Sequence, residues 1–191
     1  MNETKQRIIN EGLKLFKSKT YKEVTVNDIC QVAKVSKHTF YYYFDSKEEI
    51  IVRAIFNSSL REEIYAQMAI MSDPLAKYKV FNQVIVSRMA NIGYDLAKEL
   101  LLIKLSKVML EGDTTIVKNH QKHQKIEEIR IELLAQAQTK GLINNMDKPR
   151  ELILYHDALT FGIIQMWCTG NGKIDLLATY SKATKSLFQE K

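Results

Sequence analysis

The amino-acid sequence predicts an all-α protein, and three observations support this prediction. The 191 residues include only two prolines and seven glycines, so few residues interrupt a helix. Apolar residues recur at helical spacing through most of the chain. Residues that cap helices precede these periodic segments, and no segment shows the alternation of a convincing β-strand.

The first 50 residues are expected to form a short helical unit. An amphipathic helix begins near Lys5. Thr25 can cap a second helix, because Asp28 stands three residues later and can reach back to it. Ser36 can cap the next helix, and Lys34-Val35 before it leaves almost no room for a loop. Two short helices joined by such a turn must cross steeply, which is the helix-turn-helix geometry.

The rest of the chain, residues 51–191, is expected to form a second, larger helical domain. Ser46 and Glu49 predict a capping box that opens a helix running to about Met68 and connecting the two domains. Later helices are expected from Asp73-Pro74 to Ile92, from about Leu96 to Leu110, from about Thr115 to Lys140, from Asp147 and Pro149 to near Gly170, and from Asp175 onward.

The second helix of the helix-turn-helix carries side chains that suit nucleic acid. Its outward donors fit phosphates and base edges in the major groove. Tyr42 is expected to face inward or toward the domain rim, and Lys47 to reach a phosphate from the first turn of its helix. The predicted DNA-binding residues are Thr25, Ser36, Lys37, His38, Thr39, Tyr41, Tyr43 and Lys47.

Residues 5–51 resemble the DNA-binding domain of TetR-type (TetR/AcrR) transcriptional regulators. The resemblance rests on GLKLF at 12–16, TVNDI at 25–29, VSKHTFYYYF at 35–44 and SKEE at 46–49. This family commonly has glycine where Thr20, Lys34 and His38 stand here. Lys34 must therefore make the turn between the two helices without the freedom of glycine at positive φ.

The resemblance implies an N-terminal three-helix DNA-binding domain and a C-terminal helical bundle for dimerisation and ligand binding. Its last two helices would pair with their copies in a second subunit, as a palindromic operator requires. Alternatively, the extra apolar residues of these helices face the core of one subunit. The predicted dimer-interface residues are Leu159, Gly162, Ile163, Tyr180, Thr184 and Leu187.

Aromatic and thioether side chains of the middle helices could line an apolar effector pocket with a few polar handles. The alternative is that such residues at helical spacing form plain core. The candidate pocket residues are Tyr78, Phe81, Met89, Tyr94, Met109, Tyr155 and Met166.

Other features of the sequence argue against several classes of site. The net charge of +6 is weak evidence for nucleic acid, because residues 1–50 hold nine Lys/Arg and seven Asp/Glu and so do not concentrate it. Cys30 and Cys168 are expected to be buried free thiols. His120 and His123 lack a third ligand, so no metal and no cofactor are predicted. No targeting or membrane-spanning segment is visible, which favours a cytoplasmic location.

Two classes of function remain from the sequence. The first is a dimeric transcriptional regulator, usually a repressor, that a small-molecule effector releases from a double-stranded DNA operator. The second is an all-helical enzyme or small-molecule carrier with an incidental helix-turn-helix. The exposed donors of the helix-turn-helix favour the regulator, so no enzymatic activity is expected. A regulator controlled by a protein partner in place of an effector also fits.

Overall fold

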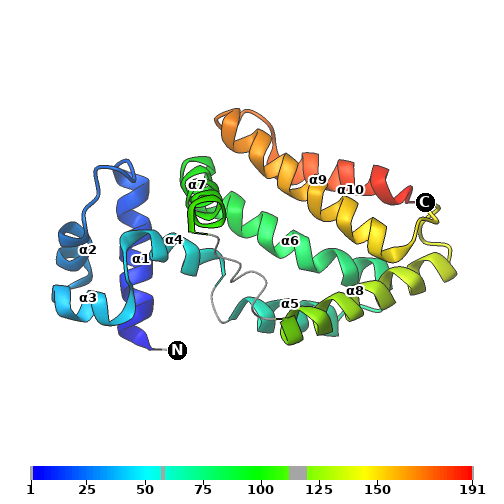
Figure 1. Cartoon of the computed structure of the whole chain (residues 1–191), viewed down its shortest axis with the longest axis horizontal. Coiled ribbons are helices and arrows are strands. Elements are labelled where there is room, and N and C mark those ends of the chain that lie inside the picture. The colour runs from blue at the N-terminus through cyan, green and yellow to red at the C-terminus, as the bar shows by residue number, and fades with distance from the viewer. Residues whose placement is uncertain (1, 57–58, 112–119, 191) are drawn as a thin grey trace.

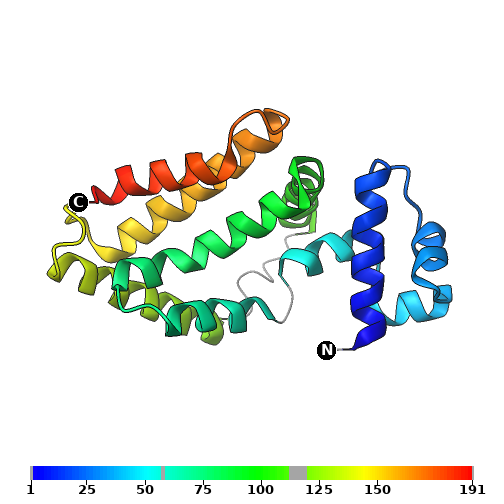
Figure 2. The same ribbon diagram turned by 180° about the vertical axis from the view of Figure 1, so that it is seen from behind.

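The computed structural model describes the backbone of residues 2–56, 59–111 and 120–190, and their side chains except those of residues 59, 61, 104–111 and 120–124. In these ranges the chain forms ten helices and no strand beyond an isolated bridge between Ile143 and Glu190, which confirms the all-α prediction. The molecule is elongated, with the three N-terminal helices at one end and the last helices at the other (Figure 1). Figure 2 shows the same arrangement from behind.

Three helices form the N-terminal end: α1 (Glu3–Ser18), α2 (Val26–Ala33) and α3 (Lys37–Tyr43). The predicted capping box of α2 is present, since Thr25 and Asp28 exchange hydrogen bonds between side chain and backbone. Ser36 caps α3 by accepting a hydrogen bond from the Thr39 backbone nitrogen at 3.0 Å. These local signals therefore set where the helix-turn-helix begins and turns.

Lys34 makes the turn between α2 and α3 in the left-handed conformation, with φ 52° and ψ 50°. The Val35 backbone nitrogen closes the end of α2 by donating to the Cys30 carbonyl at 3.0 Å. A lysine in this region is strained, because its Cβ crowds the backbone where glycine would not. The strain expected at Lys34 from the sequence is thus present at the turn that aims α3.

Replacing Lys34 by glycine is expected to raise the free energy of unfolding by about 0.5–1 kcal/mol, because glycine removes this strain. Urea denaturation measures the change. Lys19→Gly is the matched control: Lys19 ends α1 in an extended conformation with φ −129°, so glycine gains nothing there. A Lys34→Gly variant no more stable than the parent would show that the turn is not strained.

The helix that was expected to run unbroken from Ser46 to Met68 is two helices, α4 (Lys47–Ile55) and α5 (Ser59–Ala69). Residues 57–58 lie outside the described ranges. Asn57 and the two serines after it are poor helix formers because their side chains compete for backbone hydrogen bonds. The capping box predicted at Ser46 is also absent, since Ser46 makes no side-chain cap and Glu49 accepts from the Asp45 backbone nitrogen at 2.9 Å.

Five further helices complete the body. Predicted start and stop signals account for most of their ends, since Asp73 and Asp175 cap helices and Gly93 ends one with φ 88°. Lys148 precedes the helix that begins at Pro149 but makes no side-chain cap. The five are α6 (Pro74–Ile92), α7 (Tyr94–Glu111), α8 (His120–Thr139), α9 (Pro149–Thr169) and α10 (Leu176–Phe188).

Two clusters of buried side chains form the core of the described chain. The first joins α1–α4 to the near ends of α6, α7, α9 and α10, and Ile50, Ile51 and Ile55 of α4 lie in it. The second lies within the body, among α5, α6, α8, α9 and α10. The predicted domain boundary at residue 50 falls inside α4, which packs on both sides, and this division stays a prediction.

Candidate nucleic-acid interface

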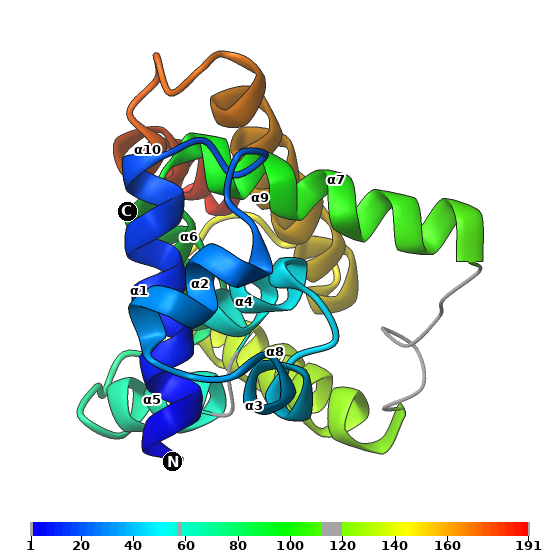
Figure 3. The same ribbon diagram turned by 90° about the vertical axis from the view of Figure 1, so that its left-hand side faces the viewer.

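Two phenylalanines anchor α3 on the three-helix unit. Phe40 and Phe44 are buried, and their ring centroids lie 5.6 Å apart. Because residues three and four apart share one face of a helix, these anchors fix which side of α3 turns inward. The opposite side is left to solvent. Figure 3 looks onto this end of the molecule, with α1, α2 and α3 in front of the body.

The outer face of α3 presents Lys37, His38, Tyr41 and Tyr42, all of them exposed. Lys37 and Tyr41 are four residues apart, as are His38 and Tyr42, so the four side chains form two neighbouring rows. They offer an ammonium group, an imidazole and two phenol hydroxyls on one short, well-anchored helix. This set can donate to phosphates and to the acceptor edges of bases in a major groove.

The structure exchanges the expected places of Tyr42 and Tyr43. Tyr42 is 76% exposed, whereas Tyr43 is half-buried and packs against the first core cluster. The reason is helical spacing, because Tyr43 lies three residues after the buried Phe40 and so shares its face. The Tyr42 and Tyr43 rings are nearly perpendicular to each other, with centroids 4.8 Å apart. Tyr42, which was left out of the predicted DNA-binding set, is thus the tyrosine available beside Tyr41.

Lys47 also lies differently from the prediction. Its ammonium group donates to the Tyr21 and Val24 carbonyls, each at 2.8 Å, and lies 4.3 Å from the centroid of the Tyr21 ring. These contacts hold the loop between α1 and α2 against the start of α4. In this arrangement Lys47 is turned to the loop and is not placed as a phosphate ligand, so we assign it a structural role.

The predicted hydroxyl donors beside α3 take part in helix capping. Thr25 donates from its hydroxyl to the Asp28 carboxylate at 2.6 Å, and this bond lowers the pKa of Asp28. The Ser36 and Thr39 hydroxyls lie 2.9 Å apart. Thr25 and Ser36 stay exposed and Thr39 half-buried, so they border the α3 surface while fixing its first turn.

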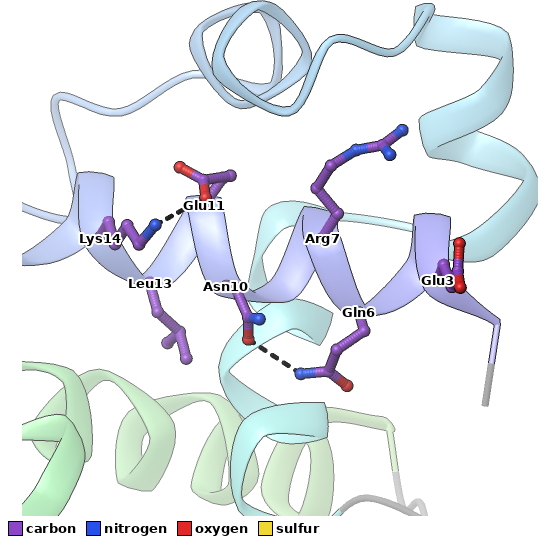
Figure 4. Close-up of a pocket in the computed structure, with 7 residues that line it drawn as sticks. All are labelled: Glu3, Gln6, Arg7, Asn10, Glu11, Leu13 and Lys14. Atoms are coloured by element: carbon purple, nitrogen blue, oxygen red, sulfur yellow. Dashed lines mark hydrogen bonds and ion pairs between the residues drawn. The ribbon is translucent and has the colours of Figure 1, made fainter.

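A shallow hollow of about 520 Å³ lies along one flank of α1 and contains none of the predicted DNA-binding residues (Figure 4). All seven residues that line it come from α1, and pairs such as Gln6 with Asn10 and Lys14 with Glu11 bond to each other. Arg7 leaves this flank to donate to the Ala33 carbonyl at 2.9 Å, which fastens the end of α2 to α1. The hollow is therefore the solvent-facing surface of a single helix.

Comparison with known proteins identifies this segment. Residues 8–54 match the family model described as "Bacterial regulatory proteins, tetR family". Over this segment the chain resembles the TetR family. A curated relative is the biofilm operon icaADBC HTH-type negative transcriptional regulator IcaR of Staphylococcus epidermidis, 36% identical over 53 residues, which are 28% of this chain and 29% of IcaR. The chain matches only about a fifth of the length of the first two curated relatives.

Solved structures of other proteins share the fold of this chain over nearly its whole length. The fatty acid degradation regulator FadR from Bacillus halodurans has a TM-score of 0.67 and 19% identity, with 98% of this chain and 96% of that chain covered. Thermus thermophilus FadR, a TetR-family repressor in complex with lauroyl-CoA, has a TM-score of 0.60 and 20% identity, with 96% and 92% covered. The predicted arrangement of an N-terminal helix-turn-helix domain before a helical body is thus confirmed.

The chain leaves an apolar stripe of α9 uncovered, and the residues of this stripe differ from the predicted dimer set. Ile163, Tyr180 and Thr184 are buried inside the chain itself, and Leu159 and Leu187 are half-buried against its own core clusters. These positions belong to the core face because they share the spacing of the buried residues. Gly162 lies on the open side. The exposed apolar residues there are Leu154, Tyr155, Phe161 and Met166 of α9.

The six candidate pocket residues whose side chains the structure describes do not come together. Tyr78 and Phe81 are buried in the body core, and Met89 in the first cluster. Tyr94 packs edge-on against Trp167, with centroids 6.3 Å apart. Two others, Tyr155 and Met166, lie on the exposed stripe of α9. The side chain of Met109, like His120 and His123 of the doubted metal pair, lies outside the described residues.

The structure reveals a buried polar cluster that the sequence reading missed. Fully buried His156 of α9 places Nδ1 3.2 Å from both the Tyr78 hydroxyl and the Asn82 side-chain nitrogen. Its Nε2 lies 3.2 Å from the Tyr180 hydroxyl and 3.3 Å from Thr184 Oγ1. Both ring nitrogens of His156 thus have hydrogen-bonding partners inside the chain. Burial, and then the charge of Arg130, lowers the pKa of His156 to about 4.

An ion pair borders this cluster. Arg130 of α8 donates to both carboxylate oxygens of Asp157, at 2.9 and 2.5 Å, and to the Tyr78 hydroxyl at 3.3 Å. Burial alone would raise the pKa of Asp157, but the bonds from Arg130 outweigh it and lower the pKa. The sequence does contain a sign of this cluster, because polar residues lie on the buried stripe of α9: His156, and Thr160 four residues later. Neighbours such as Tyr155 point elsewhere, as helix geometry requires.

The described residues show no group of three or more His, Cys, Asp or Glu able to hold a metal ion. Cys30 and Cys168 are buried free thiols, as expected, and burial raises the pKa of Cys168 to about 11. Within the described residues, no helix has the length and apolar character needed to cross a bilayer.

Proposed function

We propose that the protein is a dimeric transcriptional regulator that binds a palindromic DNA operator through α3, and that it acts in the cytoplasm as a repressor. The outer face of α3 carries the proposal. Lys37, His38, Tyr41 and Tyr42 stand exposed in two rows on a helix that Phe40 and Phe44 anchor. Among the described residues these four side chains form no ion pair or side-chain hydrogen bond of their own, whereas a major groove accepts one helix presenting polar and aromatic side chains.

A second copy of the chain completes the proposed reader. One α3 contacts only a few base pairs, and two-fold DNA readers place two such helices in successive major grooves. The exposed stripe of α9, with Tyr155, Phe161 and Met166, offers an apolar surface on the body for pairing with its copy. In this proposal residues 1–50 bind DNA and residues 51–191 hold the dimer and the effector.

The proposed effector is a small molecule that binds in the helical body. Lauroyl-CoA bound to the FadR of Thermus thermophilus supports acyl-CoA thioesters as the first compounds to test. The cluster around His156 and Arg130 supplies polar groups inside an otherwise apolar core, where a ligand could be oriented. Release would follow from a higher affinity of the ligand for the form that does not fit the operator.

The DNA-binding surface is tested by substitutions at Lys37 and Tyr41. After an operator is selected from random DNA, Lys37→Ala should change the preferred bases and weaken binding about tenfold, because a base contact contributes ~1–3 kcal/mol. Tyr41→Phe should weaken binding to all sequences alike, by a few-fold, because it removes one phosphate hydrogen bond worth ~1 kcal/mol. Fluorescence anisotropy with labelled duplexes measures both effects.

Lys182→Ala is the control for this experiment. Lys182 is an exposed lysine of α10, outside the DNA-binding helices, and its loss changes the net charge equally. Binding by this variant should equal that of the parent. If the Lys37 and Tyr41 variants also bound the operator as the parent does, α3 would not be the reading surface.

A further inference from the structure

The junction between the DNA-binding helices and the body runs through α4. This helix packs against α1 on one side and against α6 and α7 on the other. Ile50, Ile51 and Ile55 are buried along it. The angle at which α4 meets the body therefore sets where α3 lies, at the far end of the molecule (Figures 1 and 3).

One side chain of α6 holds the end of this helix. The last carbonyl groups of a helix have no partner within it. Arg88 donates from Nη1 to the Ile55 carbonyl at 2.7 Å, and its Nη2 forms an ion pair with Glu63 of α5. The Arg88 side chain is only 14% exposed, so water competes weakly for these bonds. Arg88 thus joins α4, α5 and α6 at the break between α4 and α5.

We propose that Arg88 is a positioning residue that fixes the angle of the DNA-binding unit on the body, and thereby the separation of the two α3 helices in the dimer. The inference rests on the proposed function. Two-fold readers tolerate little error in this separation, because half-sites lie ~34–36 Å apart. A planar guanidinium with two directed bonds can hold such an angle, whereas a single contact acts as a pivot.

The same helix connects this junction to the buried polar cluster. Tyr78 and Asn82, which contact His156, lie on α6 before Arg88. A helix moves largely as a rigid rod, rising ~1.5 Å per residue, so a ligand that displaces Asn82 also displaces Arg88. Arg88 would then pull on the Ile55 carbonyl. This is a physical route from the body to α4 that uses contacts present in the chain.

The test compares Arg88→Met, Arg88→Lys and the parent on the selected operator and on operators with the half-sites moved by one base pair. Arg88→Met should bind the operator about tenfold more weakly, because it loses a charged hydrogen bond worth ~1.5 kcal/mol. It should also discriminate less between half-site spacings. Arg88→Lys should be intermediate, because an ammonium can reach the Ile55 carbonyl or Glu63 but does not form the fork.

Two further variants separate positioning from folding. Lys17→Ala removes an exposed bond of 3.0 Å to the Asn91 carbonyl across the same junction, and should leave affinity and spacing preference unchanged. Glu63→Gln breaks the ion pair without emptying the core, since Glu63 is 41% exposed, and should still relax the spacing preference.

Folded, dimeric Arg88→Met with the parental affinity and spacing preference would overturn the inference. If that variant does not fold, a parental spacing preference in Glu63→Gln would overturn it instead. A parent that selects no operator would defeat the proposed function itself, which is a different result from variants that match a DNA-binding parent.

Discussion

Lowering the pH from 7 to 4 is expected to cost the protein about 3 kcal/mol of its free energy of unfolding through His156 alone. The folded-state pKa of His156 is lowered to about 4 from an ordinary value of 6.5. Between these values the unfolded chain binds a proton that the folded chain does not, so acid favours unfolding. The stabilisation is complete above pH 6.5 and is lost as the pH falls to 4.

The pH window distinguishes His156 from the carboxylates. Asp157 and Glu49 have lowered pKa values, and they lose their stabilising effect only below their ordinary values of 3.8 and 4.5. Protonation of His156 is unfavourable because the ring is fully buried and because Arg130 adds a positive charge nearby. A loss of stability between pH 6.5 and 4.5 therefore reports on the buried imidazole.

The measurement is urea denaturation at several pH values, with the protomer concentration held constant because dimer stability depends on it. His156→Gln keeps a polar side chain but does not titrate, and other histidines contribute equally to parent and variant. The difference in unfolding free energy between the two proteins should shrink by about 1.4 kcal/mol per pH unit in this window. A difference that stays constant from pH 6.5 to 4.5 would contradict the assignment.

Replacing Phe161 by aspartate is expected to give a folded monomer that binds the operator at least about 100-fold more weakly. A monomer contacts one half-site only, whereas the two linked subunits of a dimer contact both. Phe161 is 56% exposed on α9, so the chain itself loses little packing. In a dimer the aspartate would be buried without a partner, which is costly. Sedimentation velocity and anisotropy measure the two effects.

Gly162 offers a sharper version of the same test. A Cβ atom built at Gly162 meets no other atom of the described chain within 4 Å. Gly162→Leu should therefore leave the fold of one subunit intact and weaken only the dimer. Ile70→Asp, at an exposed apolar position beyond the end of α5, serves as control and should remain dimeric. A dimeric Phe161→Asp protein would show that subunits pair elsewhere.

The sequence predicted the helix-turn-helix well because its signals are local. Thr25 and Ser36 cap the helices that directly follow them, and Lys34 adopts the expected left-handed turn. The exchange of Tyr42 and Tyr43 could have been avoided, because the spacing from Phe40 already placed Tyr43 on the buried face. At the end of α4, the Ile55 carbonyl accepts a hydrogen bond from Arg88, which lies 33 residues later. A local pattern does not contain that contact.

The body was harder to predict because its site is assembled from distant parts of the chain. Three helices, α6, α9 and α10, contribute to the cluster around His156, with Asn82 and Tyr180 far from it in sequence. Apolar spacing alone does not separate a core face from an interface face on helices that carry both. For this reason Tyr180 was expected at the dimer interface, although it lies inside the subunit.

Selection of binding sites from a random duplex library tests the central claim, operator reading by paired α3 helices, most directly. The parent protein should enrich one palindromic sequence whose half-sites lie ~34–36 Å apart, or a multiple of that distance, and Lys37→Ala should enrich a different one. No enriched sequence, or a single asymmetric site bound by one subunit, would contradict the account.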